Sequence, residues 1–556
     1  MSTKWSGSLA AVAGFDAVLI GSGINTLTAG AMLARDGWRV CVLEQSDRLG
    51  GAIRTESDYT RPGFTHELLS SWHPLFTGSA AYAELGDELH RRGLEYVNTE
   101  LPTATWFPDG SGMVLHTSLE ANVAEFERFA AGDGTAWQRQ FEQFMANADL
   151  SFGVLGTELW SGAGLGLGQR LLRRLGRRGL LEFAGHAVSS CRDWTTATFA
   201  SQEARGLLAP WVLHTGLGPE SAVSGFMTQV IACALQLGGM PVPVGGGVRL
   251  VEALSAIVQD TGGELRTTAE VERILVSDGT ANGVVLAGGE TLAATRAVIA
   301  GVTPTQLYGR LLGAGESPGE VRDAAARYRY GRADMQIHLA LDEPPRWRGP
   351  DAARLAQTAI VHVTPGLDGV SRAVNEADRG LLPAEPTIVV GQPCALDPSR
   401  APEGKSILWL QLQELPAGTV HGDAANELDT GDGAWTDELR EAYADRVVGR
   451  LGDAIENLTG ATLERRVLSP ADLERLNPNL VGGDPYAGSC ALDQNLVWRP
   501  FAASPGHATV VDRLWHVGAS THPGPGLGAG SGYLVAKELT KPPLRQRVLA
   551  RLPGRS

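Results

Sequence analysis

The stretch DAVLIGSG, from Asp16 to Gly23, begins the first regular pattern of the chain and decides its fold. Its apolar run predicts a short buried strand, and the glycines predict a tight turn into an amphipathic helix that stops near Gly37. The stretch RVCVL, from Arg39 to Leu43, predicts a second strand, which ends at Glu44. This strand–helix–strand order indicates parallel strands and an α/β fold with a doubly wound sheet.

The turn between the first strand and the helix suits a pyrophosphate group. Gly21 and Gly23 let the backbone approach it closely, and Ile24 and Asn25 begin the helix, whose N-terminus offers free N–H groups. Glu44 is placed to bind ribose hydroxyls and to repel a 2′-phosphate. These residues predict a dinucleotide site, and the alternative is a glycine-rich turn in an unrelated α/β protein.

One residue departs from the usual spacing of this turn. Thr26 stands where a third glycine is common, because that glycine normally lets the helix pack closely on the strand. We therefore expect the helix to pack slightly farther from the strand.

A second glycine pair follows in DRLGG, residues 47–51, with Arg54 three residues later. Nicotinamide-binding domains do not need this pair. The stretch closely resembles flavoproteins of the amine-oxidase and phytoene-desaturase superfamily. That resemblance implies that Gly50 and Gly51 admit the pyrophosphate–ribityl part of FAD and that Arg54 partners phosphate charge. The alternative for Arg54 is a solvated surface arginine.

The C-terminal stretch VGASTHPGPGLG, residues 517–528, resembles the closing motif of the same superfamily. The resemblance implies that Gly518, Ala519, Gly526 and Leu527 lie beside the ribityl chain and the flavin ring. The following helix N-terminus would then favour the anionic reduced flavin. The stretch departs from the common pattern at Pro525, where glycine or alanine is usual.

Three further stretches sharpen this resemblance: RYG at 329–331, DPSRAPEGK at 397–405 and NPN at 477–479. They look like phytoene desaturase and phytoene dehydrogenase-related FAD-dependent oxidoreductases, in a branch named for a pyridine nucleotide-disulfide oxidoreductase domain. The resemblance implies FAD as the cofactor and places the backbone of Val271 beside adenine. It also implies a Rossmann-like FAD-binding domain of the amine-oxidase type with a discontinuous α+β substrate domain.

Changes of pattern along the chain divide it into five pieces. The predicted FAD-binding domain comprises residues 1–75, 239–303 and 481–556. The predicted substrate domain comprises residues 76–238, which look mainly helical, and residues 304–480.

Composition excludes several other classes of protein. The 556-residue chain has a formal net charge of −15, which argues against nucleic acid as a partner. Its five cysteines include no C-x-x-C pair, which excludes a zinc ribbon and a redox dithiol, and we expect no metal site. We expect a cytoplasmic protein, because the sequence shows no disulfide framework, secretory signal or spanning helix.

Hydride transfer to flavin N5 needs a substrate C–H held in a dry cavity and, in many enzymes, a group that accepts a proton. The histidines in suggestive positions are His73, His214 and His522. A structural role is the favoured interpretation for each of them. As a hypothesis, His522 or His214 is catalytic and lines the substrate face.

The predicted function is an FAD-dependent dehydrogenase or desaturase that takes hydride from a hydrophobic small molecule, with oxygen or a quinone as electron acceptor. The nearest alternative is an FAD-dependent isomerase or saturase acting on a double bond. An amine oxidase and a non-catalytic lipid-binding escort protein are weaker alternatives, and oligomerisation stays open.

Residues 165–183 (LGLGQRLLRRLGRRGLLEF) carry arginines among leucines at helical spacing. In an acidic protein this segment suits a helix lying on an anionic membrane surface. An ordinary amphipathic helix, or a contact between copies of the chain, is the favoured interpretation.

Overall fold

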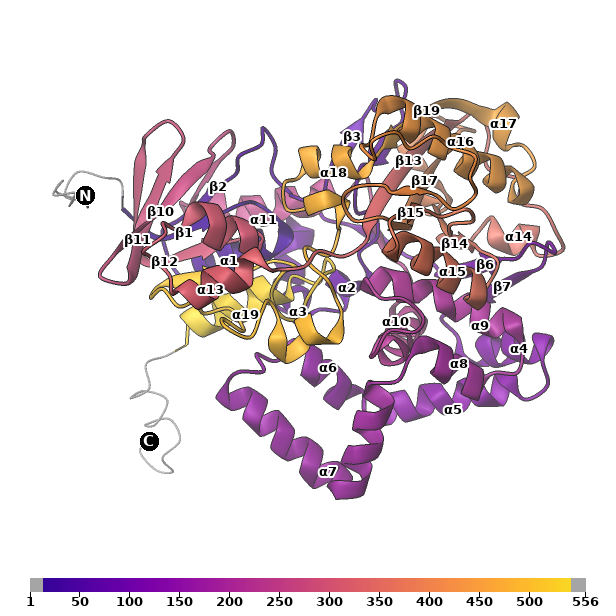
Figure 1. Cartoon of the computed structure of the whole chain (residues 1–556), viewed down its shortest axis with the longest axis horizontal. Coiled ribbons are helices and arrows are strands. Elements are labelled where there is room, and N and C mark those ends of the chain that lie inside the picture. The colour runs from indigo at the N-terminus through magenta and orange to yellow at the C-terminus, as the bar shows by residue number, and fades with distance from the viewer. Residues whose placement is uncertain (1–13, 542–556) are drawn as a thin grey trace.

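The computed structural model describes residues 14–541, which form two large sheets in separate parts of the molecule (Figure 1). The first sheet has the order β10-β11-β12-β1-β2-β9, and β20 pairs with β12. The pairs β1–β2, β1–β12, β2–β9 and β12–β20 are parallel, as the βαβ pattern predicts. Its strands are β1 (Gly14–Ile20), β2 (Val40–Leu43), β9 (Glu264–Arg266), β10 (Val271–Ser277), β11 (Thr280–Leu286), β12 (Thr291–Ala300) and β20 (Leu514–His516).

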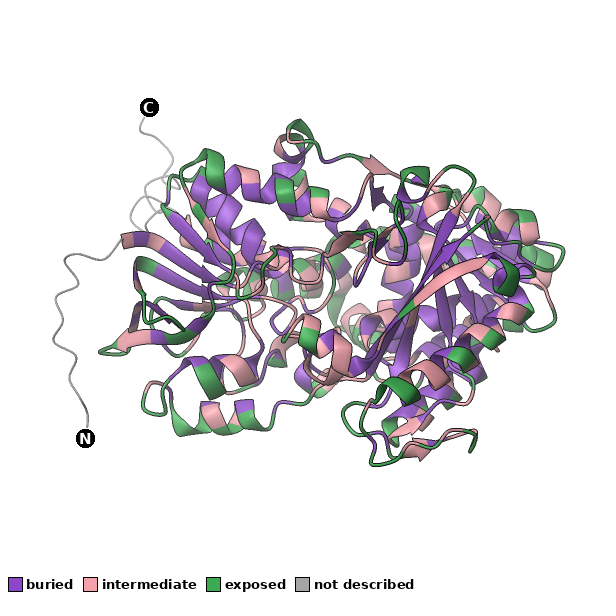
Figure 2. Ribbon diagram, turned by 90° about the horizontal axis from the view of Figure 1, so that it is seen from above, coloured by how far each residue is buried: buried purple, intermediate pink, exposed green. Residues whose placement is uncertain are grey.

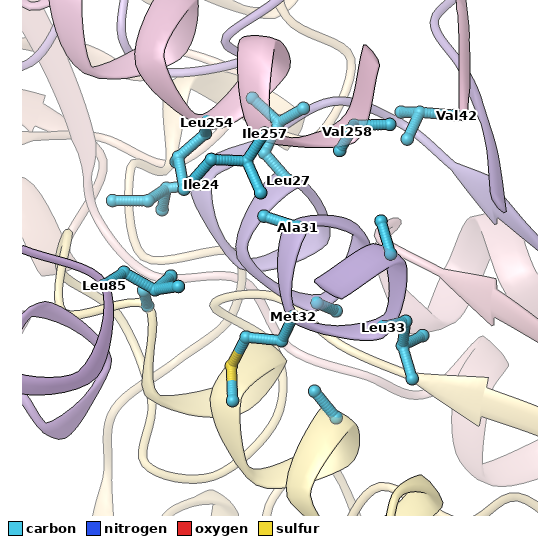
Figure 3. Close-up of a cluster of buried hydrophobic side chains, with 14 of the residues drawn as sticks. Ile24, Leu27, Ala31, Met32, Leu33, Val42, Leu85, Leu254, Ile257 and Val258 are labelled. Carbon is cyan, nitrogen blue, oxygen red and sulfur yellow. The ribbon is translucent and has the colours of Figure 1, made fainter. Parts of the chain in front are cut away.

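The first helix, α1 (Ile24–Arg35), lies at the centre of the first hydrophobic core (Figure 3). It packs against α11 (Val248–Asp260) and α19 (Gly530–Leu539). Leu27 and Leu33 are fully buried, and burial of such a side chain contributes about 1.5–3 kcal/mol relative to leaving it exposed. The packing of α1 against α11 and α19, which come from distant parts of the sequence, therefore holds the turn that precedes α1 in place.

The second sheet has the order β19-β13-β17-β16-β14-β6-β7. Helix α16 (Asp437–Ala454) packs its apolar residues against this sheet. Most strand residues of both sheets are buried (Figure 2). The strands of the second sheet are β6 (Thr103–Trp106), β7 (Gly112–Leu115), β13 (Ala333–Leu341), β14 (Ile360–Val363), β16 (Ile388–Gly391), β17 (Ser406–Leu415) and β19 (Thr462–Leu468).

The stretch 76–238 contains more than the helices that its pattern predicts. Its strands β6 and β7 form an antiparallel hairpin, and β6 pairs in parallel with β14. The sequence PDGS at 108–111 connects them and is typical of a turn between strands. The helices of this stretch are α3 (Ala80–Arg91), α4 (Leu119–Phe129), α5 (Asp133–Ala146), α6 (Ala148–Gly156), α7 (Gly162–Ala187), α8 (Cys191–Thr198), α9 (Gln202–Leu208) and α10 (Ser224–Gly238).

A buried ion network joins the first part of the chain to the junction near residue 245. Arg400 is fully buried, and its guanidinium pairs with Glu67 at 2.9 Å and with Asp397 at 2.8 Å. Glu67 also accepts a hydrogen bond from the backbone N–H of Gly247, and Asp397 accepts one from that of Gly245. The network therefore holds the start of α11 in place.

Helix α7 stands away from the two sheets at the edge of the molecule (Figure 1). It is kinked at Gly176, whose backbone is not helical. Leu165 and Leu181 are each 74% exposed, and Trp160 just before the helix is 64% exposed. Among the helices of residues 14–541, none is both long enough and apolar enough to span a membrane. The division into domains stays a prediction, and the outer ends of its first and last pieces lie outside the described residues.

Candidate functional site

One cavity between the two sheets gathers the residues singled out from sequence. Every predicted cofactor-binding residue lines this cavity. They are Gly21, Gly23, Ile24, Asn25, Glu44, Gly50, Gly51, Arg54, Val271, Gly518, Ala519, Gly526 and Leu527.

The two glycine motifs meet at the start of α1. Gly23 and Gly50 form an isolated parallel bridge, so the second motif lies directly against the first turn. Gly50 has a φ of +123°, and a Cβ there would come within 2.4 Å of the carbonyl oxygen of Ile53. A side chain is therefore excluded at this position. A Cβ on Gly23 would meet nothing within 4 Å, so the backbone there is open to close approach.

Ser22 connects three parts of this site. Its hydroxyl donates to Glu44 Oε2 at 2.6 Å and accepts from the backbone N–H of Gly50 at 3.0 Å. The other oxygen of Glu44 accepts from the backbone N–H of Ser46 at 3.0 Å. The Glu44 carboxylate therefore lies beside the turn at the end of β2, where a dinucleotide-binding fold places its ribose-binding acid.

Thr26 is accommodated by a glycine from another strand. Gly301 follows β12, and a Cβ there would lie 2.2 Å from the Thr26 hydroxyl oxygen. The missing side chain at residue 301 thus makes room for the threonine. Thr26 therefore packs closely against the backbone at residue 301, and the expected displacement of α1 from the strand stays a prediction.

Arg54 and Val271 are engaged with neighbouring side chains. Arg54 is half-buried, and its guanidinium pairs with Glu56 at 3.1 Å. The carbonyl of Val271 accepts from the Arg310 guanidinium at 3.3 Å. Both residues line the cavity, and their contacts with FAD stay a prediction.

The closing motif is held by a buried arginine. Arg499 is 1% exposed and donates twice to the carbonyl of Ala519, at 2.7 and 2.9 Å. It also donates to the carbonyl of Tyr486 at 2.9 Å. The backbone N–H of Gly518 donates to the Ser531 hydroxyl at 3.0 Å, which joins the motif to the first turn of α19. No motif singled out Arg499, because its partners are carbonyls of separate loops.

The part of the cavity between α10 and the second sheet is mainly apolar. Its lining side chains are large and mostly buried, which provides a setting from which water is excluded. They include Trp72, Trp211, Leu235, Met240, Ile360 and Trp409.

A polar wall adjoins these apolar side chains. It consists of Asp334 and Gln336 on β13 and of Gln411 and Gln413 on β17, and all four line the cavity. Burial raises the pKa of Asp334 well above its ordinary value, and the nearby Asp484 adds to this effect. Sequence analysis missed these residues, although polar residues at alternate positions of the strand ADMQIHLAL were a usable signal.

The structure separates the two candidate catalytic histidines. His214 lines the cavity, and its Nε2 lies 3.1 Å from Nε2 of His362. Burial lowers its pKa to about 3, so the ring is neutral at neutral pH. His522 is outside the set of cavity-lining residues and lies near Glu158 and His507, which makes it a poorer candidate for substrate contact.

His73 is also buried, and its Nδ1 lies 2.9 Å from the Tyr96 hydroxyl. Burial lowers its pKa to about 3. It does not line the cavity, which favours a structural role.

The glycine turn, the acid after β2 and the open backbone at Gly23 together define a dinucleotide-binding oxidoreductase site, and they fit FAD. Residues 27–466 match the family described as flavin containing amine oxidoreductases, to which this chain belongs. It is an FAD-dependent oxidoreductase of that family, as the sequence predicts.

Similar proteins confirm the predicted resemblance. One subunit of the limonene dehydrogenase of Castellaniella defragrans is 25% identical, over 95% of this chain and 94% of its own. Pyridine nucleotide-disulfide oxidoreductase domain-containing protein 2 of Rattus norvegicus is 27% identical over 94% of each chain. The neurosporene-forming phytoene desaturase of Cereibacter sphaeroides is 24% identical over 96% of each.

The fold is also confirmed by a solved structure. An oxidoreductase from Methanosarcina mazei has a TM-score of 0.59 and 15% identity, over 94% of this chain and 99% of that one.

Proposed function

We propose that this protein is a dehydrogenase or desaturase that transfers a hydride from a hydrophobic small molecule to flavin N5. The observation that carries the proposal is one continuous cavity, which is lined both by the predicted cofactor-binding residues and by apolar side chains of the second sheet and α10. A substrate C–H held there faces the cofactor without bulk water between them. Bound FAD supplies the hydride acceptor.

The roles of the chain's own residues follow from their places. Gly21, Gly23, Gly50 and Gly51 admit the pyrophosphate–ribityl part, and Glu44 holds the ribose. Trp72, Trp211 and Trp409 enclose the substrate and exclude water. His214 is neutral and lines the cavity, so it can orient a polar group of the substrate, and its low pKa makes it a weak proton acceptor.

The names of two relatives support this substrate class. They are a dehydrogenase of limonene and a desaturase of phytoene, and each matches this chain over nearly its whole length. Oxygen or a quinone is the proposed electron acceptor. An isomerase or saturase that uses the same site without net oxidation is the nearest alternative, followed by an amine oxidase.

An anaerobic titration of the purified holoprotein tests the proposal. The flavin absorbance near 450 nm is recorded while a terpene hydrocarbon, a polyene, an amine and NADPH are added in separate experiments. We expect bleaching by a hydrocarbon and none by NADPH. Bleaching by the amine alone would establish the amine oxidase instead.

Helix α7 supports a separate proposal, contact with an anionic membrane surface. The exposed Leu165 and Leu181 share this helix with Arg178, whose side chain is 93% exposed. Apolar and basic groups together suit the interface of an anionic bilayer. Flotation with phosphatidylglycerol vesicles, and not with phosphatidylcholine vesicles, would support it. Absence of flotation at low salt would leave α7 as a surface helix or a contact between copies.

A further inference from the structure

The polar wall results from strict alternation along two neighbouring strands. On β13, Asp334 and Gln336 line the cavity, whereas Met335 and Ile337 between and beside them pack into the core under α16. Strand β17 repeats the pattern, and Gln336 lies directly opposite Gln411 in the antiparallel register. Because side chains alternate between the faces of a strand, these polar groups share the cavity face of the sheet.

Only some of the polar atoms of the wall have hydrogen-bond partners within the protein. The Gln413 carboxamide donates to the Tyr486 hydroxyl at 2.9 Å, and the Gln411 carboxamide donates to Asp334 Oδ2. Within residues 14–541, no hydrogen-bond partner exists for Asp334 Oδ1, Gln336 Oε1 or Gln413 Oε1. These residues are at most 4% exposed. Buried polar atoms in native proteins normally have partners, so three unpaired oxygens at one cavity wall point to a ligand.

Asp334 is the only ionisable side chain among the four wall residues. Burial raises the pKa of Asp334 well above its ordinary value, so burial disfavours its carboxylate form; Asp484 acts in the same direction, whereas the Gln411 hydrogen bond and Arg332 act in the opposite one. Among the neighbouring groups, His214 is neutral because burial lowers its pKa to about 3. Burial likewise raises the pKa of Tyr486 and keeps its hydroxyl neutral. A neutral ligand group therefore matches the wall better than an ammonium.

We propose that the wall formed by Asp334, Gln336, Gln411 and Gln413 binds a hydroxyl group on an otherwise apolar substrate, and that it selects alcohols over the corresponding hydrocarbons. This inference rests on the proposed function, because it assumes that the substrate occupies the cavity beside the wall.

The chemistry of a hydroxyl suits this wall in two respects. A hydroxyl donates to an unpaired oxygen and also accepts from a carboxamide N–H. It therefore fits either orientation of the Gln336 carboxamide. A hydrocarbon leaves the oxygens unpaired, and a ketone or ether cannot donate to them. The flanking Trp409 and Ile360 accept the apolar remainder of the molecule.

A set of ligands with one carbon skeleton tests the inference: limonene, perillyl alcohol and perillylamine. Their dissociation constants for the purified holoprotein are measured anaerobically by calorimetry, which needs no turnover. We expect perillyl alcohol to bind about tenfold more tightly than limonene, as one good buried hydrogen bond allows. In Gln336→Leu and in Gln413→Leu, the preference should fall to about threefold or less, with limonene affinity retained.

The matched control is Gln138→Leu on α5, because Gln138 is exposed and outside the cavity. It should keep the tenfold preference. Each variant is first checked for flavin content and apparent Tm, and the wild-type comparison stands even if a variant does not fold. Equal binding of alcohol and hydrocarbon, no binding of the alcohol, or a preference unchanged in both wall variants would overturn the inference. Tighter binding of perillylamine would overturn it in favour of an ammonium site.

The two proposals fail separately. Alcohol selectivity without flavin bleaching by any organic compound would leave the hydroxyl site standing and refute the dehydrogenase. Flavin bleaching by hydrocarbons without tighter binding of the alcohol would support the dehydrogenase and refute the hydroxyl site.

Discussion

The contact between Thr26 and Gly301 gives a sharp prediction, because Thr26 lies on α1 and Gly301 lies just after the end of β12. Gly301→Ala would place a methyl group 2.2 Å from the Thr26 hydroxyl oxygen and 3.0 Å from the carbonyl oxygen of Ile20. The threonine is 2% exposed, so the close packing around it leaves its side chain little room to turn away. Overpacking of this kind costs about 1–3 kcal/mol.

We expect the upper part of that range, because the second contact is with backbone. This corresponds to a fall in apparent Tm of roughly 2–3 °C, because the entropy of unfolding of a 556-residue chain is large. Heating the holoprotein and following the rise in flavin fluorescence on release measures this change. Gly288→Ala is the control, since Gly288 is exposed and a Cβ there meets nothing within 4 Å. It should change the free energy of unfolding by less than about 0.5 kcal/mol.

A double-mutant cycle separates the steric cause from any other. Thr26→Ala removes the hydroxyl and leaves the Cβ of residue 26 at 3.5 Å, an ordinary contact distance. The pair Thr26→Ala/Gly301→Ala should therefore be at least about 1 kcal/mol more stable than the two single changes predict together. An unchanged Tm in Gly301→Ala, or strict additivity in the double variant, would refute the reasoning.

Three other changes test the site and the fold. Ser22→Ala removes the hydroxyl that connects Glu44 and Gly50, and it should weaken FAD binding about tenfold. The affinity is measured by reconstituting the apoprotein with FAD, and an unchanged affinity would contradict the role of Ser22. Arg400→Leu leaves the buried Glu67 and Asp397 unpaired and should cost about 3–5 kcal/mol in a denaturant melt, whereas Arg178→Ala at an exposed pair should cause no measurable change. As the pH falls below about 6.5, the Tm should decrease. Burial holds the pKa of His214 at about 3 and that of His522 at about 4, so the unfolded chain takes up protons that the folded chain does not. A Tm that is constant or rises between pH 6.5 and pH 4.5 would contradict this.

Much of the cofactor site was predictable because its signals are local. The apolar run before Gly21 and the acid at the end of the next strand form one βαβ unit, and each part is recognisable within a few residues. The backbone at Gly50 and Gly518 has positive φ, which favours glycine and leaves a mark in the sequence. The family and the cofactor follow from these marks.

The part of the cavity beside the second sheet has no comparable local signal in the sequence. The hairpin of β6 and β7 lies in a stretch whose pattern is dominated by helices, and its place in the second sheet depends on pairing with β14. His522 belongs to a glycine-rich motif that does reach the cavity, but its own side chain lies near Glu158. Proximity in sequence to a cofactor motif is therefore a poor guide to which side chain lines the cavity.

By itself the sequence determined the class of protein, its cofactor and the glycine turn that we propose as the pyrophosphate site. This was achievable because strand, turn and helix each depend on neighbouring residues. Only the tertiary structure decided that Gly301 makes room for Thr26 and that Asp334, Gln336, Gln411 and Gln413 form one wall. The physical reason is that packing and strand register join residues far apart in the chain, so no single segment carries the information.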